Sequence, residues 1–116
     1  YYDMGGQWRE LTGGGMVYAV WVARREFAAA QPQLVMQVQQ RLRKAFTYGL
    51  EHLKEAAAWI RRDGFTAEEI VHYIGLLNYD MTSKHQQALL GFYQRAYALD
   101  LIEKVPQLIF AGEAQA

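Results

Sequence analysis

The sequence predicts an α/β fold class in which most of the chain is α-helical and one β-strand is buried. The strand is indicated by an unbroken apolar run at residues 16–22. The longest helix is indicated by apolar residues that recur every three or four positions within Pro32–Asp63. Threonine-based capping signals further along predict additional helices. At 116 residues, the chain is expected to be a single segment with a modest core.

The composition is typical of a folded globular protein and limits the partners to be expected. Hydrophobic residues make up 52% of the chain, and twelve basic side chains balance twelve acidic ones. No net field therefore favours nucleic acid or a membrane surface, and no apolar stretch approaches the roughly 20 residues of a membrane span. The absence of cysteine excludes thiolate-ligated metal sites and is typical of cytoplasmic proteins. We expect a cytoplasmic protein with neither a nucleic-acid nor a membrane partner.

The first two predicted elements are a short helix and the apolar strand. Asp3 is the expected N-cap of the helix and Gly13 its end, with Trp8 and Leu11 on one face. Met16–Val22 is rich in β-branched and aromatic residues without polar alternation, which is typical of a strand covered on both faces. Because a lone strand cannot satisfy its backbone hydrogen bonds, we expect its partners outside this sequence. A chain that does not start with methionine favours an upstream part of the same polypeptide.

Helices are predicted for most of the remaining chain. The proline suits the first turn of a helix over Pro32–Asp63, and Gly49 is expected to bend or divide it. Gly64 suits a helix stop, and Thr66 with Glu69 predicts a capping box for the next helix.

A last helix is predicted to begin at Thr82 or Ser83, and Pro106 closes the helical part of the chain. The small-residue tail 111–116 is expected to be frayed. The buried face of the last helix is expected to consist of Leu89, Phe92, Tyr93 and Ala96.

Two groups of polar residues have compositions that metal or phosphate sites use. Glu69 and His72 have the Glu-x-x-His spacing of helical di-iron sites. A second pair is missing, because the only histidine beside Glu51 and Glu55 is His52, so no metal is expected. A set of basic residues is interleaved with glutamines, which favours a solvated helix face over a phosphate site. This set comprises Arg41, Arg43, Lys44, Arg61 and Arg62.

A helical interaction or DNA-binding module is one alternative that the pattern leaves open. The helices that begin at Thr66 and Thr82 have the proportions of a helix-turn-helix. The second of them offers few side chains suited to reading bases, which weakens this alternative. Those side chains are Lys84, Gln86, Gln87, Gln94 and Arg95.

A family resemblance is carried by three segments of the chain. Chorismate dehydratases of the futalosine route to menaquinone contain D-L-G-x-x-W-x-x-x-T-G-L-P-F-V-F-A-x-W, which this chain resembles in YDMGGQWRELTGGGMVYAVWVARR. Their long helix is similar to RLRKAFTYGLEHL, and their closing segment to LNYDMTSKHQQALLGFYQRAYALDLIEKVPQLIF. The resemblance covers residues 2–110 and corresponds to the C-terminal part of a considerably longer protein.

The resemblance implies the two-lobed periplasmic-binding-protein type II fold, with this chain as its C-terminal segment. Residues 1–23 would form the end of the second lobe and the crossover strand, residues 24–110 helices that pack on the first lobe, and residues 111–116 a tail. The implied partner is the missing N-terminal part of the same polypeptide.

The resemblance also implies a lyase that removes water from chorismate to give 3-[(1-carboxyvinyl)oxy]benzoate without a cofactor. This elimination needs a proton acceptor, two carboxylate anchors and exclusion of solvent. Because the catalytic residues are expected upstream, the chain alone is expected to be inactive. The sister enzyme dihydroxynaphthoate synthase shares the fold and stays open as an alternative, although the VYAVW run favours the dehydratase.

Four residues of the chain are candidates for substrate binding under this resemblance. Thr12 and Gly13 would offer a hydroxyl and an amide to a carboxylate, and the rings of Tyr18 and Trp21 would line the cleft. A structural role is the alternative for all four, since aromatic residues in an apolar segment usually serve packing.

The chain departs from the family pattern at two places. It has Gly14, Gly15 and Met16 where the family has Leu-Pro-Phe, which adds backbone freedom near the expected cleft. Asp100 stands where the family usually has a helix-ending glycine. The first departure affects loop order or substrate fit.

Overall fold

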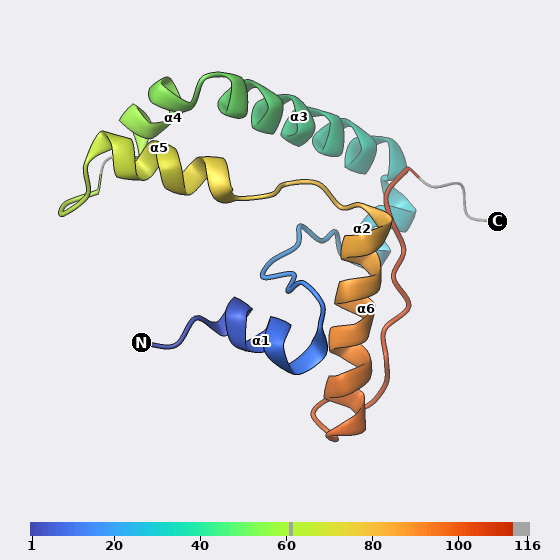
Figure 1. Cartoon of the computed structure of the whole chain (residues 1–116). Coiled ribbons are helices and arrows are strands. Elements are labelled where there is room, and N and C mark those ends of the chain that lie inside the picture. Colours follow the sequence, from blue (N-terminus) through green and yellow to red (C-terminus); the bar gives the residue numbers. More distant parts are fainter. Residues whose placement is uncertain (61, 113–116) are drawn as a thin grey trace. The chain divides into compact units, whose positions relative to one another are not determined.

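The computed structural model describes residues 1–60 and 62–112, and all regular secondary structure within them is helical (Figure 1). The chain divides into two compact units. The terminal unit combines Tyr1–Val22 with the chain from Met81 onward, and the central unit is Ala23–Asp80. The prediction of a mostly helical chain is confirmed.

Helix α1 of the terminal unit spans Met4–Thr12 and has the predicted ends. The Asp3 carboxylate accepts a hydrogen bond from the backbone N–H of Gly5 (3.1 Å), which satisfies one of the free donors of the first turn. Gly13 adopts a left-handed conformation (φ 72°) that a residue without a side chain reaches without steric cost.

Helix α6, the second helix of the terminal unit, spans Ser83–Ala98 and is capped by Thr82, as predicted. The N–H of His85 donates to Thr82 Oγ1 (3.4 Å), and the N–H of Thr82 donates to His85 Nδ1 (3.3 Å). The pair is therefore a capping box in which a histidine takes the usual place of glutamate. Of the predicted buried face of α6, Leu89 and Ala96 are buried, whereas Tyr93 is half-buried and Phe92 is exposed.

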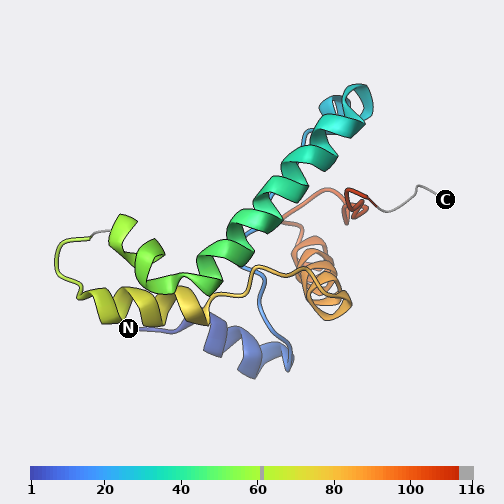
Figure 2. The same ribbon diagram turned by 90° about the horizontal axis from the view of Figure 1, so that it is seen from above.

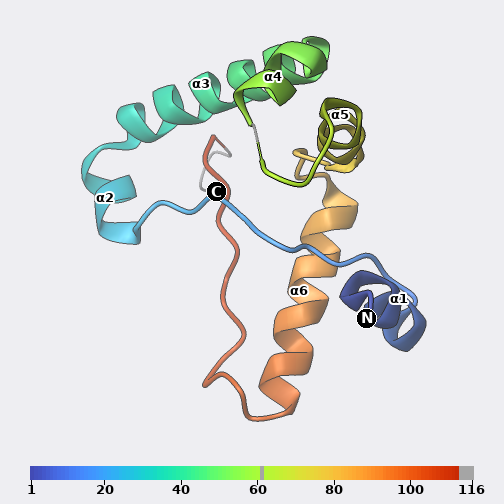
Figure 3. The same cartoon turned by 90° about the vertical axis from the view of Figure 1, so that its left-hand side faces the viewer.

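Helix α6 ends in a Schellman motif with an aspartate at the left-handed position. Asp100 has φ 56°, its N–H donates to the carbonyl oxygen of Tyr97, and the N–H of Leu101 donates to that of Ala96. The chain then turns and runs back along α6 (Figures 1 and 3). The aspartate thus occupies the conformation that glycine most readily supplies.

The central unit contains four helices: α2 (Arg25–Ala30), α3 (Pro32–Glu51), α4 (Leu53–Trp59) and α5 (Ala67–Leu76). The sequence does not predict α2. The single helix expected over Pro32–Asp63 is divided into α3 and α4 at His52 (φ −126°, ψ 45°), shortly after Gly49. The expected division near Gly49 is thus confirmed, while the helical part ends earlier than Asp63.

Helices α4 and α5 form an antiparallel pair, side by side in Figures 1 and 2. The predicted capping box of Thr66 and Glu69 begins α5. Ala57 of α4 and Ile74 of α5 are buried, and the open face of Gly75 lies against the Leu53 side chain. This pair holds the buried residues of the central unit.

The prediction of a buried strand at Met16–Val22 is wrong. These residues have no regular secondary structure, and Tyr18, Trp21 and Val22 are exposed. A strand exists only through hydrogen bonds to a neighbouring strand, and the described residues contain none. β-branched and aromatic residues favour a position on a sheet surface rather than an extended backbone by itself.

The core of the described residues is smaller than expected. Only four of them, all apolar, are 9% exposed or less: Ala57, Ile74, Leu89 and Ala96. Many large apolar side chains are exposed on the helices and on the segment that follows α1. Since helices in proteins are stabilised mainly by packing of an apolar face, these faces are suited to contact with further protein. Among the helices described, none combines the length and apolar character needed to cross a membrane.

Candidate functional site

The candidate residues Thr12 and Gly13 form the end of α1. The Thr12 hydroxyl donates to the carbonyl oxygen of Trp8 (2.8 Å) and accepts from the N–H of Gly14 (3.2 Å). The N–H of Gly13 donates to the carbonyl oxygen of Arg9 (2.8 Å). Both groups expected to face a carboxylate therefore have acceptors within the terminal unit, and the structural alternative accounts for their contacts.

Trp8 is the central side chain of this region, and the sequence predicts only its place on the apolar face of α1. Its indole N–H donates to the carbonyl oxygen of Gly15 (3.2 Å). Its ring lies 5.5 Å from the ring of Phe92 and 5.6 Å below the guanidinium of Arg95 on α6. Trp8 therefore connects α1, α6 and residues 13–15, which we call the glycine loop.

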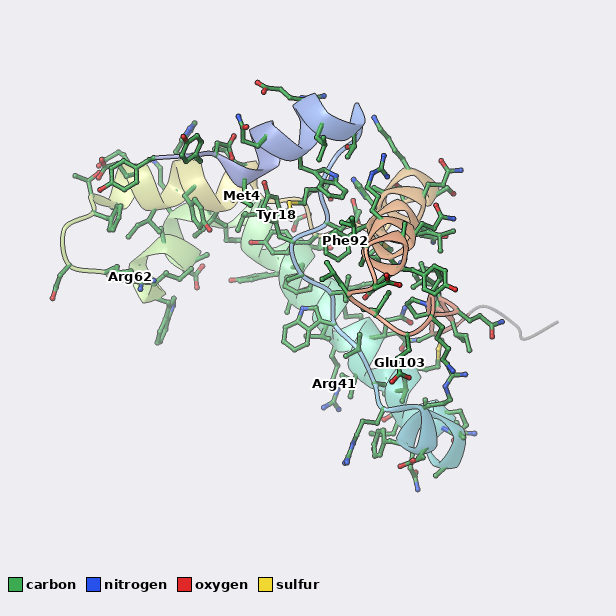
Figure 4. The ribbon with its side chains drawn as sticks, turned by 90° about the horizontal axis from the view of Figure 1, so that it is seen from below. Met4, Tyr18, Arg41, Arg62, Phe92 and Glu103 are labelled. Atoms are coloured by element: carbon green, nitrogen blue, oxygen red, sulfur yellow. The ribbon has the colours of Figure 1, made fainter. Side chains whose placement is uncertain are left out.

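The structure separates the two aromatic candidates. The Tyr18 hydroxyl lies over Gly5 so closely that a side chain at residue 5 would collide with it, and Figure 4 shows Tyr18 beside α1 near Met4. Tyr18 is nevertheless 71% exposed. Trp21 is 78% exposed and has no hydrogen bond or ring contact to any described residue. Neither ring belongs to a buried core.

Glu69 of the central unit belongs to the cap at the start of α5. Glu69 Oε2 accepts from the backbone N–H of Thr66 (2.8 Å) and from its hydroxyl (3.0 Å). These two hydrogen bonds, the backbone one first, hold the pKa of Glu69 below its usual value. His72 is exposed, and no group of three metal-binding side chains occurs in the described ranges.

A second polar cluster marks the division between α3 and α4. The Tyr48 hydroxyl donates to Glu55 Oε2 (3.3 Å), and the ring of His52 stacks on that of Tyr48 at 4.0 Å. His52 Nδ1 lies 2.8 Å from the carbonyl oxygen of Tyr48. The negative charge of Glu55, and then this hydrogen bond, raise the pKa of Tyr48. The cluster tethers the two helices across their break.

The basic residues do not form one site in the described chain. Arg41, Arg43, Lys44 and Arg62 are exposed, while Arg61 lies outside the described residues. Figure 4 shows Arg62 near the α4–α5 connection and Arg41 along α3. An open hollow of about 460 Å³ beside Arg62 is lined mainly by Ala57, Ala58, Phe65, Ala67 and Ile70. A solvated helix face, as predicted, describes Arg41, Arg43 and Lys44 of α3, whereas Arg62 lies beyond the end of α4.

Trp8 and Thr12 tie the glycine loop to α1. The segment that contains them lies within the part of the chain that a family model matches. The model described as "Menaquinone biosynthesis" matches residues 1–98. The chain belongs to this menaquinone biosynthesis family. No solved structure matches it.

The match to the menaquinone biosynthesis family extends over residues 1–98, which include α1 through α6 and all four candidate residues. The helices of the helix-turn-helix alternative, α5 and α6, belong to different units.

Proposed function

We propose that this chain is the C-terminal segment of a two-lobed α/β chorismate dehydratase, a cytoplasmic lyase of menaquinone biosynthesis. This proposal rests on the sequence of the segment from Asp3 to Trp21, which resembles the corresponding segment of the dehydratases. Its place within the family match supports the assignment. Its glycine loop is tied to α1 by the side chains of Trp8 and Thr12.

The proposed reaction converts chorismate to 3-[(1-carboxyvinyl)oxy]benzoate and water. A ring proton passes to a base, the ring hydroxyl leaves with a second proton as water, and the ring becomes aromatic. The enolpyruvyl group stays attached. Such an elimination requires that the two substrate carboxylates be held and that bulk water be excluded from the base.

In this proposal, residues of the chain form one wall of the site and do not supply the base. Thr12 and Gly13 hold the glycine loop in the place where a substrate carboxylate binds. The exposed rings of Tyr18 and Trp21 line the cleft. Aromatic rings suit this role because they offer flat apolar area to an unsaturated ring.

The proposal also includes a partner, the N-terminal part of the same polypeptide. Its support is the small core of the described chain and the many apolar side chains that remain exposed, among them Leu11, Trp21 and Leu101. This partner would cover part of these faces and carry the proton acceptor.

The experiment is a substrate comparison with the complete polypeptide. Chorismate and the substrate of dihydroxynaphthoate synthase are supplied separately, and the products are identified by NMR. We expect only chorismate to react, giving a product with an aromatic ring and an intact enolpyruvyl group. Reaction of the second substrate alone would assign the sister activity instead.

Two tryptophan variants test the proposed wall. Trp21→Ala is expected to raise KM for chorismate several-fold, whereas Trp59→Ala, which also removes an exposed ring, is the matched control and should not. Equal KM values in the two variants would remove Trp21 from the site.

The DNA-binding alternative is tested with the same polypeptide. Salt-sensitive binding of duplex DNA without turnover of chorismate would favour the DNA-binding module.

A further inference from the structure

The side chain of Trp8 is held from both sides. Phe92 and Arg95 of α6 pack on its ring, and Arg95 is itself anchored by a hydrogen bond to the carbonyl oxygen of Gly91 (3.2 Å). On the other side, the indole N–H donates to the carbonyl oxygen of Gly15. The direction of the Gly15 carbonyl is therefore set by a side chain that has little freedom to move.

Fixing this carbonyl also fixes the next backbone N–H. In a trans peptide the C=O of one residue and the N–H of the next lie in one plane and point in opposite directions, and no described peptide bond is cis. The N–H of Met16 therefore points away from the Trp8 indole. It donates to no acceptor within the described ranges.

Two of the three backbone donors of the glycine loop differ from this one. The N–H of Gly13 and that of Gly14 are both bound within the terminal unit. The N–H of Gly15, like that of Met16, donates to no acceptor within the described ranges, but it does not belong to the peptide whose carbonyl Trp8 binds. A side-chain carbon placed on Gly15 would meet no atom of a non-adjacent residue within 4 Å, and Gly15, which shares a peptide with the N–H of Met16, is exposed. A free, oriented N–H next to an exposed glycine is suited to a carboxylate, which accepts backbone N–H donors strongly.

We infer that Trp8 is a positioning residue that aims the Met16 backbone N–H at a carboxylate of the substrate. This inference rests on the proposed function and deepens it by naming the donor and the residue that orients it. Neither Trp8 nor Met16 is among the four residues expected to bind substrate. Orientation before binding lowers the cost of ordering the loop, so its loss appears mainly in KM.

The test uses the complete polypeptide with Trp8→Phe, which removes the indole N–H and keeps an aromatic ring next to Phe92 and Arg95. Trp59→Phe is the matched control, because Trp59 is exposed, makes no hydrogen bond to a described residue and lies outside the proposed site. Two measurements are made on each: the heteronuclear NOE of the Gly15 and Met16 amides, and KM and kcat for chorismate. Thermal unfolding confirms that both variants fold.

For Trp8→Phe we expect reduced NOE values at Gly15 and Met16 and a KM raised about three- to tenfold, the usual effect of one lost hydrogen bond. The change in kcat should stay below about twofold. Trp59→Phe should leave the NOE values and KM unchanged. NOE values or a KM for Trp8→Phe equal to those of Trp59→Phe, with turnover intact, would overturn the inference.

Failure of the proposed function has a different signature. If the wild-type polypeptide does not convert chorismate, the proposed reaction and the substrate role of Met16 are both rejected. The NOE comparison then still decides whether Trp8 orders the glycine loop. A Trp8→Phe variant that fails to fold would overturn the inference too, because it would assign the Trp8 indole N–H to the stability of the unit.

Discussion

The indole nitrogen of Trp8 donates a hydrogen bond to the carbonyl oxygen of Gly15, 3.2 Å away. With the bond from the N–H of Gly14 to the Thr12 hydroxyl, it ties the glycine loop to α1 at two points. Of the three loop glycines, only Gly13 has a positive φ. The loop therefore needs glycine at its first position and is compatible with other residues at the next two.

The first prediction concerns the double variant Gly14→Leu with Gly15→Pro, which restores the residues of the family pattern. Neither position requires a left-handed backbone, and a side-chain carbon at Gly14 comes no closer than 3.6 Å to Thr12 Oγ1. Restricting the unfolded chain should raise the free energy of unfolding by roughly 0.4–1 kcal/mol. KM for chorismate should fall several-fold at most.

Urea unfolding and steady-state kinetics of the complete polypeptide check this prediction. Gly13→Leu is the control and should destabilise the protein, because its backbone is left-handed (φ 72°). Lower stability of the double variant together with weaker substrate use would show that Gly14 and Gly15 are backbone requirements.

The second prediction concerns the end of α6. Asp100 holds a left-handed backbone (φ 56°), which is strained for a residue with a side chain. Asp100→Gly should therefore raise the free energy of unfolding, by about 0.5–1 kcal/mol once the greater freedom of glycine in the unfolded chain is counted. Asp80→Gly, at a position without positive φ, should lower it. Thermal unfolding measures the stability change in both variants. Equal changes in the unfolding temperature would contradict the Schellman motif assigned to the end of α6.

The third prediction is a pH dependence at the start of α5. Hydrogen bonds from Thr66 lower the pKa of Glu69 below its ordinary value of 4.5. The contribution of this carboxylate to stability is therefore present above pH 4.5 and is lost as pH falls through the lowered pKa. An NMR titration of the Glu69 carboxyl carbon should show the lowered pKa. Thr66→Ala should raise the pKa of Glu69 only part of the way toward its ordinary value, because the hydrogen bond from the backbone N–H of residue 66 remains. An unchanged pKa of Glu69 in this variant would exclude the Thr66 hydroxyl as a cause of the shift.

The fourth prediction concerns the tether between α3 and α4. The charge of Glu55 raises the pKa of Tyr48 above its ordinary value of 10.0. The neutral hydroxyl is therefore the form that stabilises the fold. Its contribution to stability is present below pH 10.0 and is lost as pH rises through the raised pKa. Glu55→Gln should lower the pKa of Tyr48. Glu51→Gln, which removes a charge without a hydrogen bond to Tyr48, is the control. A pH titration followed by ¹³C NMR of the tyrosine ring measures the pKa of Tyr48 in both variants. Equal pKa values in the two variants would contradict the contact between Tyr48 and Glu55.

Local signals in the sequence predict the helix ends well. The Asp3, Thr66 and Thr82 caps and the Gly13 stop are all observed, because each depends on hydrogen bonds between residues close in sequence. The division at His52 is displaced from Gly49 only slightly for the same reason. His85 in a capping box was missed, since the known pattern expects glutamate or glutamine there.

Features that depend on distant residues were not predictable in the same way. The strand expected at Met16–Val22 needs a neighbouring strand, and β-propensity carries no information about one. Trp8 was recognised only as an apolar helix residue, because its contacts to Gly15, Phe92 and Arg95 come from tertiary structure. The run of three glycines shortly after Trp8 is the signal in the sequence that could have indicated a close approach of side chain and backbone.

The measurement that tests the central claim most directly is the conversion of chorismate, followed by mass spectrometry, by the complete polypeptide and by residues 1–116 alone. We predict that the complete polypeptide yields a product lighter by one water. The 116-residue chain should yield none, because the proposed proton acceptor and one wall of the cleft belong to the other part. Unchanged chorismate with the complete polypeptide, or turnover by residues 1–116 alone, would contradict the account.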